Sequence, residues 1–196
     1  MTPTDKKHLE ASQQLLALLG GAVAKKRAGE VKQAFEAPEA YVKRYAKALS
    51  VRGISEPVPL LGWVAVIDAL QKARACVGID WKTAPTDVAR AVGKLGGAKQ
   101  PKWLADRELA ERSTEEALEL AGAELRAAGK LLVSLESGGD EFNLVVVPKA
   151  KLTKVKQLAK ATKQVIEVFD GSRLAQAESR RKTVRPSAPV PPGSSS

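Results

Sequence analysis

Cysteine and histidine are almost absent from this chain of 196 residues, which contains one of each, Cys76 and His8. A single cysteine cannot form an intramolecular disulfide, and one thiolate with one imidazole cannot build the usual zinc cage. A Ser–His–Asp or Cys–His catalytic set is also unsupported, because the only histidine falls in the first predicted helix. Oxygen ligands are therefore the one realistic route to a metal ion.

Long apolar runs are missing as well. The longest one, residues 58–70, is shorter than the roughly 20 residues that a helix needs to cross a bilayer, and it contains Asp68. The first ten residues carry charges where a secretory signal would have an apolar core. We therefore expect a cytoplasmic protein without a membrane segment.

The net charge of +10 is distributed unevenly along the chain. Residues 101–150 hold 6 Lys and Arg against 10 Asp and Glu, whereas residues 151–196 hold 10 Lys and Arg against 3 Asp and Glu. The basic excess is therefore largest at the end of the chain. A basic tail is a weaker sign of a polyanionic partner than a basic groove would be.

Apolar periodicity and chain-breaking residues divide the sequence into helices and strands. Helices are expected over residues 4–19, 24–50 with a break at Pro38, 60–75, 87–95, 114–128 and 150–162. Thr4 is expected to cap the first helix and Gly20-Gly21 to end it, while Ser113 and Glu116 have the spacing of a capping box. Strands are expected over residues 75–81, 131–136, 141–147 and 165–170.

The order of these elements predicts an α+β fold. An N-terminal helical layer over residues 1–52 is followed by a ferredoxin-like antiparallel sheet (β-α-α-β-β-α-β) backed by helices over residues 53–170, and the two pack as one unit. The strand order is left open. Residues 171–196 have too few core-forming side chains to fold, and we expect them to form a disordered basic tail rich in Pro and Ser.

The connection between the second and third strands reads Gly-Gly-Asp-Glu-Phe at residues 138–142. It resembles the signature hairpin of GGDEF-domain diguanylate cyclases, in which the turn contacts a nucleotide and an acidic residue binds a divalent metal. The resemblance implies nucleotide contacts at Gly138, Gly139, Asp140 and Glu141. It also implies a Mg²⁺ site at Asp80, Asp140 and Glu141.

The same turn has a purely structural interpretation. The match covers one hairpin, and the family's "DxLTGLxNR" stretch is missing. Gly-Gly and Asp are residues that a tight turn between two strands prefers. The inward-facing residues of the two strands are expected to be Leu131, Val133, Leu135, Phe142, Leu144 and Val146. We favour the structural interpretation.

A second resemblance covers about half of the chain. The segments GIDWKTAPTDVARAVGKL, residues 78–95, and ALELAGAELRAAGKLLVSLESGGDEFNLVVV, residues 117–147, are similar to a bacterial domain family of unknown function. In that family an Asp-Trp-Lys element precedes a short helix, and a hairpin containing Asp follows. This resemblance implies a fold and no particular chemistry.

Four lysines fall on one face of the last predicted helix, at intervals of seven, four and three residues. They are Lys149, Lys156, Lys160 and Lys163. Such a basic strip can contact phosphates or an acidic partner, but a solvated helix face is the interpretation that we favour. The aromatic residues available on the strands to stack on bases are Trp81, Phe142 and Phe169, and each is expected to lie in the core.

The sequence contains no complete catalytic constellation. We therefore expect a non-enzymatic domain without a cofactor that binds another macromolecule, with a protein as the expected partner, in an accessory, regulatory or immunity-type role. One alternative is a degenerate or divergent GGDEF-like nucleotide-binding or cyclase domain that uses Mg²⁺, with Asp68 as an extra candidate beside Asp80. The other is a nonspecific nucleic-acid binder that uses the basic helix and the tail.

Overall fold

Helices and one antiparallel sheet follow each other in the order expected from the sequence. The computed structural model describes residues 2–96, 109 and 112–174. The helices are α1 (Pro3–Lys25), α2 (Ala28–Glu36), α3 (Pro38–Ser50), α4 (Leu61–Lys72), α5 (Pro85–Gly96), α6 (Thr114–Ala127) and α7 (Leu152–Ala161), which follows the 3-10 turn η3 (Lys149–Lys151). The strands are β1 (Val77–Asp80), β2 (Lys130–Leu135), β3 (Glu141–Pro148) and β4 (Ile166–Phe169). The α+β class is confirmed.

The first helix differs at both ends from the sequence prediction. Thr2 and not Thr4 is the N-cap, because its hydroxyl accepts a hydrogen bond from the N–H of Asp5 at 3.2 Å, and the Asp5 carboxylate accepts one from the N–H of Thr2 at 2.8 Å. The helix also continues past Gly20. Gly21, at φ +60°, produces a kink there, and the chain remains helical to Lys25.

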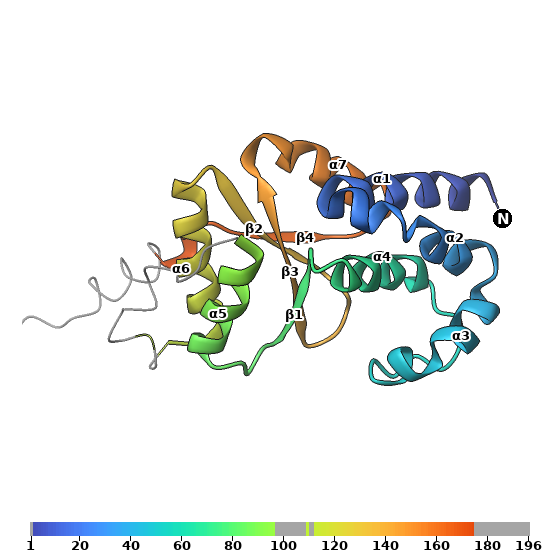
Figure 1. The fold of residues 1–196 in the computed structure, drawn as a ribbon, viewed down its shortest axis with the longest axis horizontal. Coiled ribbons are helices and arrows are strands. Elements are labelled where there is room, and N and C mark those ends of the chain that lie inside the picture. Colours follow the sequence, from blue (N-terminus) through green and yellow to red (C-terminus); the bar gives the residue numbers. More distant parts are fainter. Residues whose placement is uncertain (1, 97–108, 110–111, 175–196) are drawn as a thin grey trace, which may run out of the picture.

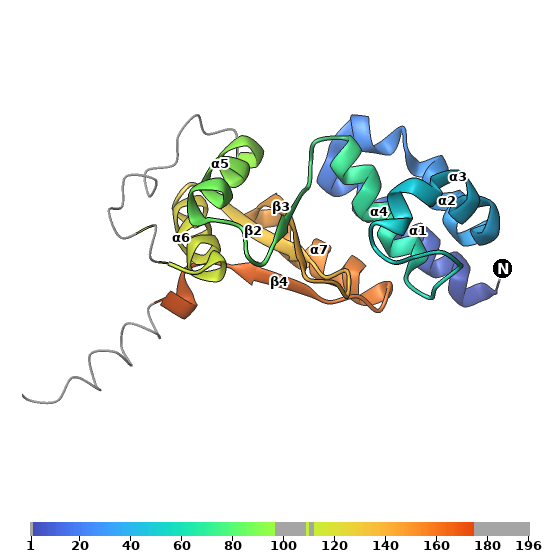
Figure 2. The same cartoon turned by 90° about the horizontal axis from the view of Figure 1, so that it is seen from below.

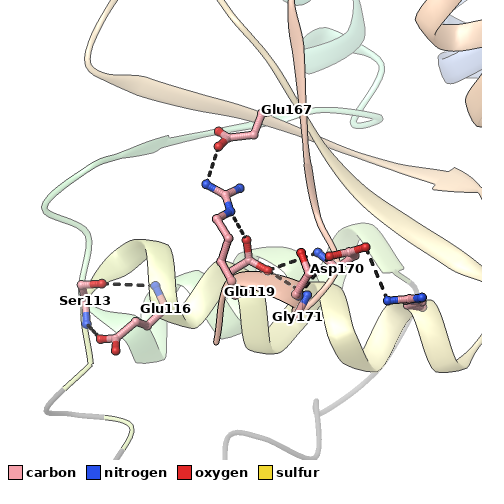
Figure 3. A network of polar contacts seen from close by, with 9 residues as sticks. Ser113, Glu116, Glu119, Glu167, Asp170 and Gly171 are labelled. Carbon is pink, nitrogen blue, oxygen red and sulfur yellow. Dashed lines mark hydrogen bonds and ion pairs between the residues drawn. The ribbon is translucent and has the colours of Figure 1, made fainter. Parts of the chain in front are cut away.

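Two other helix starts lie where the sequence placed them. Pro38 occupies the first turn of α3, where its missing N–H would have no partner in any case. Ser113 and Glu116 form the predicted capping box at the start of α6 (Figure 3). The Glu116 N–H donates to Ser113 Oγ at 3.2 Å, and the Ser113 N–H donates to Glu116 Oε2 at 2.9 Å.

The strands form a sheet in the order β1-β3-β2-β4 with antiparallel neighbours. The connections β1 to β2 and β3 to β4 step in the same direction across the sheet, although β1 and β3 run in opposite directions. Right-handed crossovers must then lie on opposite faces of the sheet. Accordingly, α5 and α6 pack on one face and α7 on the other, so helices cover both faces.

Each face of the sheet has its own apolar core. Leu131, Val133 and Leu135 pack with α1, α4 and α7, whereas Leu144 packs with α5 and α6. The prediction that these four residues share one face is wrong, because Val133 pairs with Val145. Figures 1 and 2 show the sheet between the α5/α6 pair on one side and helices α1–α4 on the other.

Helix α4 is the most deeply buried element of the N-terminal part. Every residue from Leu61 to Leu70 except Asp68 is buried, as expected for a helix that is apolar all round. A Cβ at Gly62 would lie 2.3 Å from the Phe35 ring, so α2 and α4 approach closely there. No helix in the described ranges is long and apolar enough to cross a membrane.

The chain that follows β4 is held against α6 by a buried carboxylate (Figure 3). Glu119, whose side chain is 4% exposed, accepts hydrogen bonds from the N–H groups of Gly171 at 2.7 Å and Asp170 at 3.3 Å. Its other oxygen lies 2.6 Å from Nε of Arg173, and Arg173 also pairs with Glu167 at 2.7 Å. Residues 171–174 of the expected tail are therefore part of the fold, and residues 175–196 lie outside the described residues.

Replacing Glu119 with Gln should lower the free energy of unfolding by about 2 kcal/mol, because the change removes the charge that two backbone donors and Arg173 share. Urea denaturation measures this difference. Glu167→Gln is the matched control, because Glu167 bonds the same arginine from a side chain that is 37% exposed. It should cost under about 0.5 kcal/mol, and equal losses in the two variants would contradict a special role for Glu119.

Candidate functional site

The turn between β2 and β3 is held in place by the buried helix α4. The indole N–H of Trp63, which is 3% exposed, donates a hydrogen bond of 2.6 Å to the carbonyl oxygen of Glu136. Trp63 lies in the first turn of α4, so a helix that is buried on almost every side sets the position of the hairpin turn. The chain therefore cannot move at Glu136 without breaking a bond to the core.

A series of hydrogen-bonded side chains connects the same turn to the segment between α3 and α4. Asn143 on β3 is fully buried; its amide accepts from Gln71 Nε2 at 3.1 Å and donates to Ser137 Oγ at 3.0 Å. Gln71 Oε1 lies 3.5 Å from Nη2 of Arg52, and the same guanidinium forms an ion pair with Asp68 at 3.1 Å. A buried amide requires such partners, and here they fix the turn a second time.

The two glycines of the turn differ in what the backbone requires. Gly138 has φ +74°, a conformation that residues with a side chain rarely adopt. Gly139 has no positive φ, and a Cβ added to it would meet nothing within 4 Å. The geometry therefore supports the structural interpretation for Gly138. At Gly139 the backbone conformation does not require glycine, and the space beside it is open.

Three hollows surround this turn. The first, of about 520 Å³, lies between the turn and the connection from α3 to α4; its walls include Val51, Ile54, Val58, Pro59, Leu60, Gly138, Gly139, Asp140 and Glu141. The second, of about 500 Å³, shares Val51, Arg52 and Glu141 with the first and extends to Gly78. The third, of about 400 Å³, is lined by Trp81, Ser134, Glu136, Gly139, Asp140, Glu141 and Phe142.

Exposed apolar side chains gather around the same turn. Among the described residues the large apolar side chains that are exposed are Val23, Val51, Trp81 and Val165. Val51 lines the first two hollows, and Trp81 lines the third. The carbonyl oxygen of Val165 accepts a hydrogen bond from the N–H of Glu136 at 3.4 Å. We call Val51, Trp81, Val165 and residues 136–141 the hairpin surface.

The prediction that Trp81 lies in the core is wrong. Its side chain is 54% exposed, because β1 ends at Asp80 and the ring follows the end of the strand. Its backbone is nevertheless fixed: the N–H donates to the carbonyl of Asp140 at 3.2 Å, and the carbonyl accepts from Thr114 Oγ1 at 2.6 Å. The core prediction is confirmed for Phe169, against which the half-buried Phe142 packs edge-on.

The carboxylates of the implied Mg²⁺ site are brought to one end of the sheet but not into one ligand set. Asp80 pairs with Glu141 across β1 and β3, and Asp140 precedes Glu141. However, Asp80 Oδ1 accepts the N–H of Lys82 at 2.7 Å within its own turn. Within the ranges that the structure describes, no group of three or more Asp, Glu, His or Cys residues is placed to hold a metal. These residues therefore do not fit the implied metal ion.

Two groups in the second hollow have shifted acidities. Burial raises the pKa of the Asp68 carboxyl, although the positive charge of Arg52 acts against this. Asp68 pairs with Arg52, so it does not supplement Asp80 as a metal ligand. Burial also raises the pKa of Cys76 to about 12, so the thiol is protonated at neutral pH and is a poor nucleophile.

The basic strip lies outside these three hollows, and its last member comes two residues before Val165 of the hairpin surface. Its members are all exposed, and they follow η3, α7 and the turn after it: Lys149, Lys156, Lys160 and Lys163. Residues 149–163 also contain Lys151 and Lys154 and have no Asp or Glu. Val155 and Leu158 are buried on the opposite side of α7.

A comparison with protein-family models matches residues 11–169 to a domain of unknown function, DUF6630. The chain belongs to this family. The predicted resemblance to a domain family of unknown function is thereby confirmed, and the DUF6630 match extends from α1 to the end of β4. No curated protein and no solved structure matches the chain.

The sequence did not predict the role of Asn143, which holds the turn from below, or of Val51 and Val165 of the hairpin surface. Asn143 gave a usable signal, because it is the one polar residue in the otherwise apolar run Phe142–Val147. A polar residue at such a position must find buried partners, and those partners identify the elements that meet there. Val51 and Val165 gave no such signal, since a single valine at the end of an element does not show whether it is covered or exposed.

Replacing Trp63 with Phe should loosen the turn of this DUF6630 domain, because the ring is largely kept while the bond to Glu136 is lost. We expect a free energy of unfolding lower by about 1 kcal/mol and faster amide hydrogen exchange at residues 137–141. Tyr45→Phe is the control, because it removes a polar atom from a half-buried ring on α3 that is not bonded to the turn. Unchanged exchange at the turn in Trp63→Phe would show that α4 does not hold it.

Proposed function

We propose that this DUF6630 domain is a non-enzymatic binding protein whose hairpin surface holds a segment of another protein that is basic and partly aliphatic. The observation that carries the proposal is the gathering of Val51, Trp81 and Val165 around one turn. Exposed apolar side chains scattered singly need no explanation, whereas a cluster of them marks an interaction site.

The rigidity of the turn supports this role. Trp63 holds the backbone at Glu136, and the buried Asn143 holds Ser137. The backbone of Trp81 is bonded on both sides while its ring remains exposed. A surface fixed in this way loses little conformational entropy on binding, and an immobilised tryptophan is a common anchor of protein interfaces.

The charges around the turn indicate the chemistry of the partner. Glu136, Asp140 and Glu141 are exposed, and among the residues described none of them forms an ion pair. Arg52, a cation that lines the first two hollows, is paired with Asp68. Complementary charge then requires Lys or Arg in the partner, and the aliphatic walls of the first hollow favour Val, Leu, Ile or Pro beside it.

The magnesium-nucleotide alternative has less support from the same geometry. A triphosphate bound at the turn would face the carboxylates of Asp140 and Glu141, and the part of the chain that the structure describes offers no ligand set for a neutralising metal ion. The protonated thiol of Cys76 and the position of His8 on α1 also give no catalytic pair. A binding role needs only the exposed carboxylates and apolar side chains of the hairpin surface, without a metal ion or a catalytic pair.

Peptides selected from a random linear library displayed on phage against the full chain should contain Lys or Arg next to aliphatic residues. Trp81→Ala should weaken the best peptide about 30-fold and Val51→Ala about fivefold, because both side chains become buried on binding. Isothermal titration calorimetry with the synthetic peptide measures these ratios.

Val23→Ala is the matched control for this experiment, since Val23 is 59% exposed but lies on α1, outside the hairpin surface. Its effect should stay within about twofold. Enrichment of acidic peptides, or an equal effect of Val23→Ala and Val51→Ala, would contradict the proposed function.

Nonspecific binding of nucleic acid is a second candidate, favoured by the six lysines and absent acids of residues 149–163. Fluorescence anisotropy with a labelled single-stranded oligonucleotide should then give an affinity that falls as salt rises. The double variant Lys156→Ala, Lys160→Ala should reduce the slope of log affinity against log salt by about 2. The control pair Lys6→Ala, Lys7→Ala on α1 should leave it unchanged, and no binding at low salt would exclude this candidate.

A further inference from the structure

We propose that the third hollow, beside Trp81, binds the guanidinium group of an arginine side chain in the partner segment. This inference rests on the proposed function and names the side chain that the hairpin surface recognises. Three observations carry it: the exposed ring of Trp81, the carboxylates of Glu136 and Asp140, and the Ser134 hydroxyl in the wall of the hollow.

The ring of Trp81 already carries a cation. Nζ of Lys82 lies 4.7 Å from the ring centroid, within the range of a cation–π contact. Lys82 is itself exposed and adjacent in sequence, so its long side chain can leave the ring at small cost. A cation from another molecule can then take the same place over the indole.

Two carboxylates border this hollow. Glu136 follows the end of β2 and Asp140 closes the turn, whereas Oε2 of Glu141 lies on the other side of the sheet, 3.5 Å from where a Cβ at Gly78 would be. Other acidic side chains of the fold are neutralised, for example Asp68 by Arg52 and Glu119 by Arg173. The carboxylates of the third hollow have no such cation within the described ranges, which makes them the available partners for a guanidinium group.

Ser134 supplies the third observation. It is 4% exposed, it lines the hollow, and its hydroxyl has no hydrogen-bond partner among the described residues. Its oxygen is not one of the buried side-chain atoms that lack a partner in the described residues, so it opens into the hollow. A donor entering the hollow would satisfy the hydroxyl oxygen, and the half-buried Phe142 provides an apolar wall beside it.

These groups match a guanidinium better than an ammonium. The guanidinium is flat, stacks on aromatic rings and presents five N–H donors in one plane, so it can cover the indole and reach carboxylates and a hydroxyl at once. An ammonium is compact, strongly hydrated and has three donors. The volume of about 400 Å³ is ample for the end of an arginine side chain.

The test uses the full chain and Nα-acetyl-arginine N-methylamide as the probe, with the lysine and citrulline analogues for comparison. The indole N–H signal of Trp81, assigned in the nitrogen-15 NMR spectrum from the Trp81→Phe variant, reports binding. The arginine probe should shift it saturably with a Kd of about 1–10 mM. The lysine probe should bind at least about threefold more weakly, and the neutral citrulline probe should produce no saturable shift.

Glu136→Gln, which keeps the shape of the side chain, should raise the Kd of the arginine probe at least about threefold. The matched control is Glu39→Gln, an exposed glutamate on α3, which should leave the Kd unchanged. Equal shifts from arginine and citrulline, no saturable shift at Trp81, or equal effects of the two Glu→Gln variants would each overturn the inference.

The two proposals fail separately. If arginine does not bind but Trp81→Ala still weakens the selected peptide, the hairpin surface is a docking site that recognises some other side chain. If arginine binds with the expected pattern but no peptide depends on Val51 or Trp81, the hollow is an arginine site and the proposed function is wrong.

Discussion

The hydrogen bond from the Trp63 indole to the Glu136 carbonyl connects the two halves of this protein. The donor belongs to α4, which is buried on almost every side among the N-terminal helices. The acceptor belongs to the turn of the central hairpin. Because α4 is fixed by its own packing, the position of the turn is fixed too. The charged groups at the turn, the hollows and the exposed apolar side chains all depend on that placement.

The strand order explains why one end of the sheet stays uncovered. With β4 beside β2, the two crossovers lie on opposite faces, and each face is closed by its own helices. The edge strand β1 has four residues, so Trp81 lies beyond its end. The hairpin surface is thus produced by a short edge strand beside a longer central hairpin, and no separate domain is needed to build it.

Local signals in the sequence were sufficient for the elements but not for their assembly. The capping box at Ser113, the break at Pro38 and the turn at Gly138 are decided by neighbouring residues, and all three lie where predicted. Local signals did not predict which side chains of β2 and β3 point to which face of the sheet. Both strands are apolar at successive positions, so no alternation of polar and apolar residues distinguishes the two faces. The exposure of Trp81 depends on where β1 ends, which pairing with β3 determines.

The acidic residues of the hairpin are not explained by the turn they form. Asp80 and Glu141 stand directly opposite each other across β1 and β3, and like charges in such a pair lower the stability of a sheet. The bond from the Lys82 N–H to Asp80 occupies one carboxylate oxygen, but no cation of the described ranges pairs with Glu141. The positive φ of Gly138 is enough to reverse the chain, so the turn itself does not require this pair of carboxylates. The cationic partner that we propose for the hairpin surface would relieve the repulsion, so a feature that weakens the isolated fold would strengthen that complex.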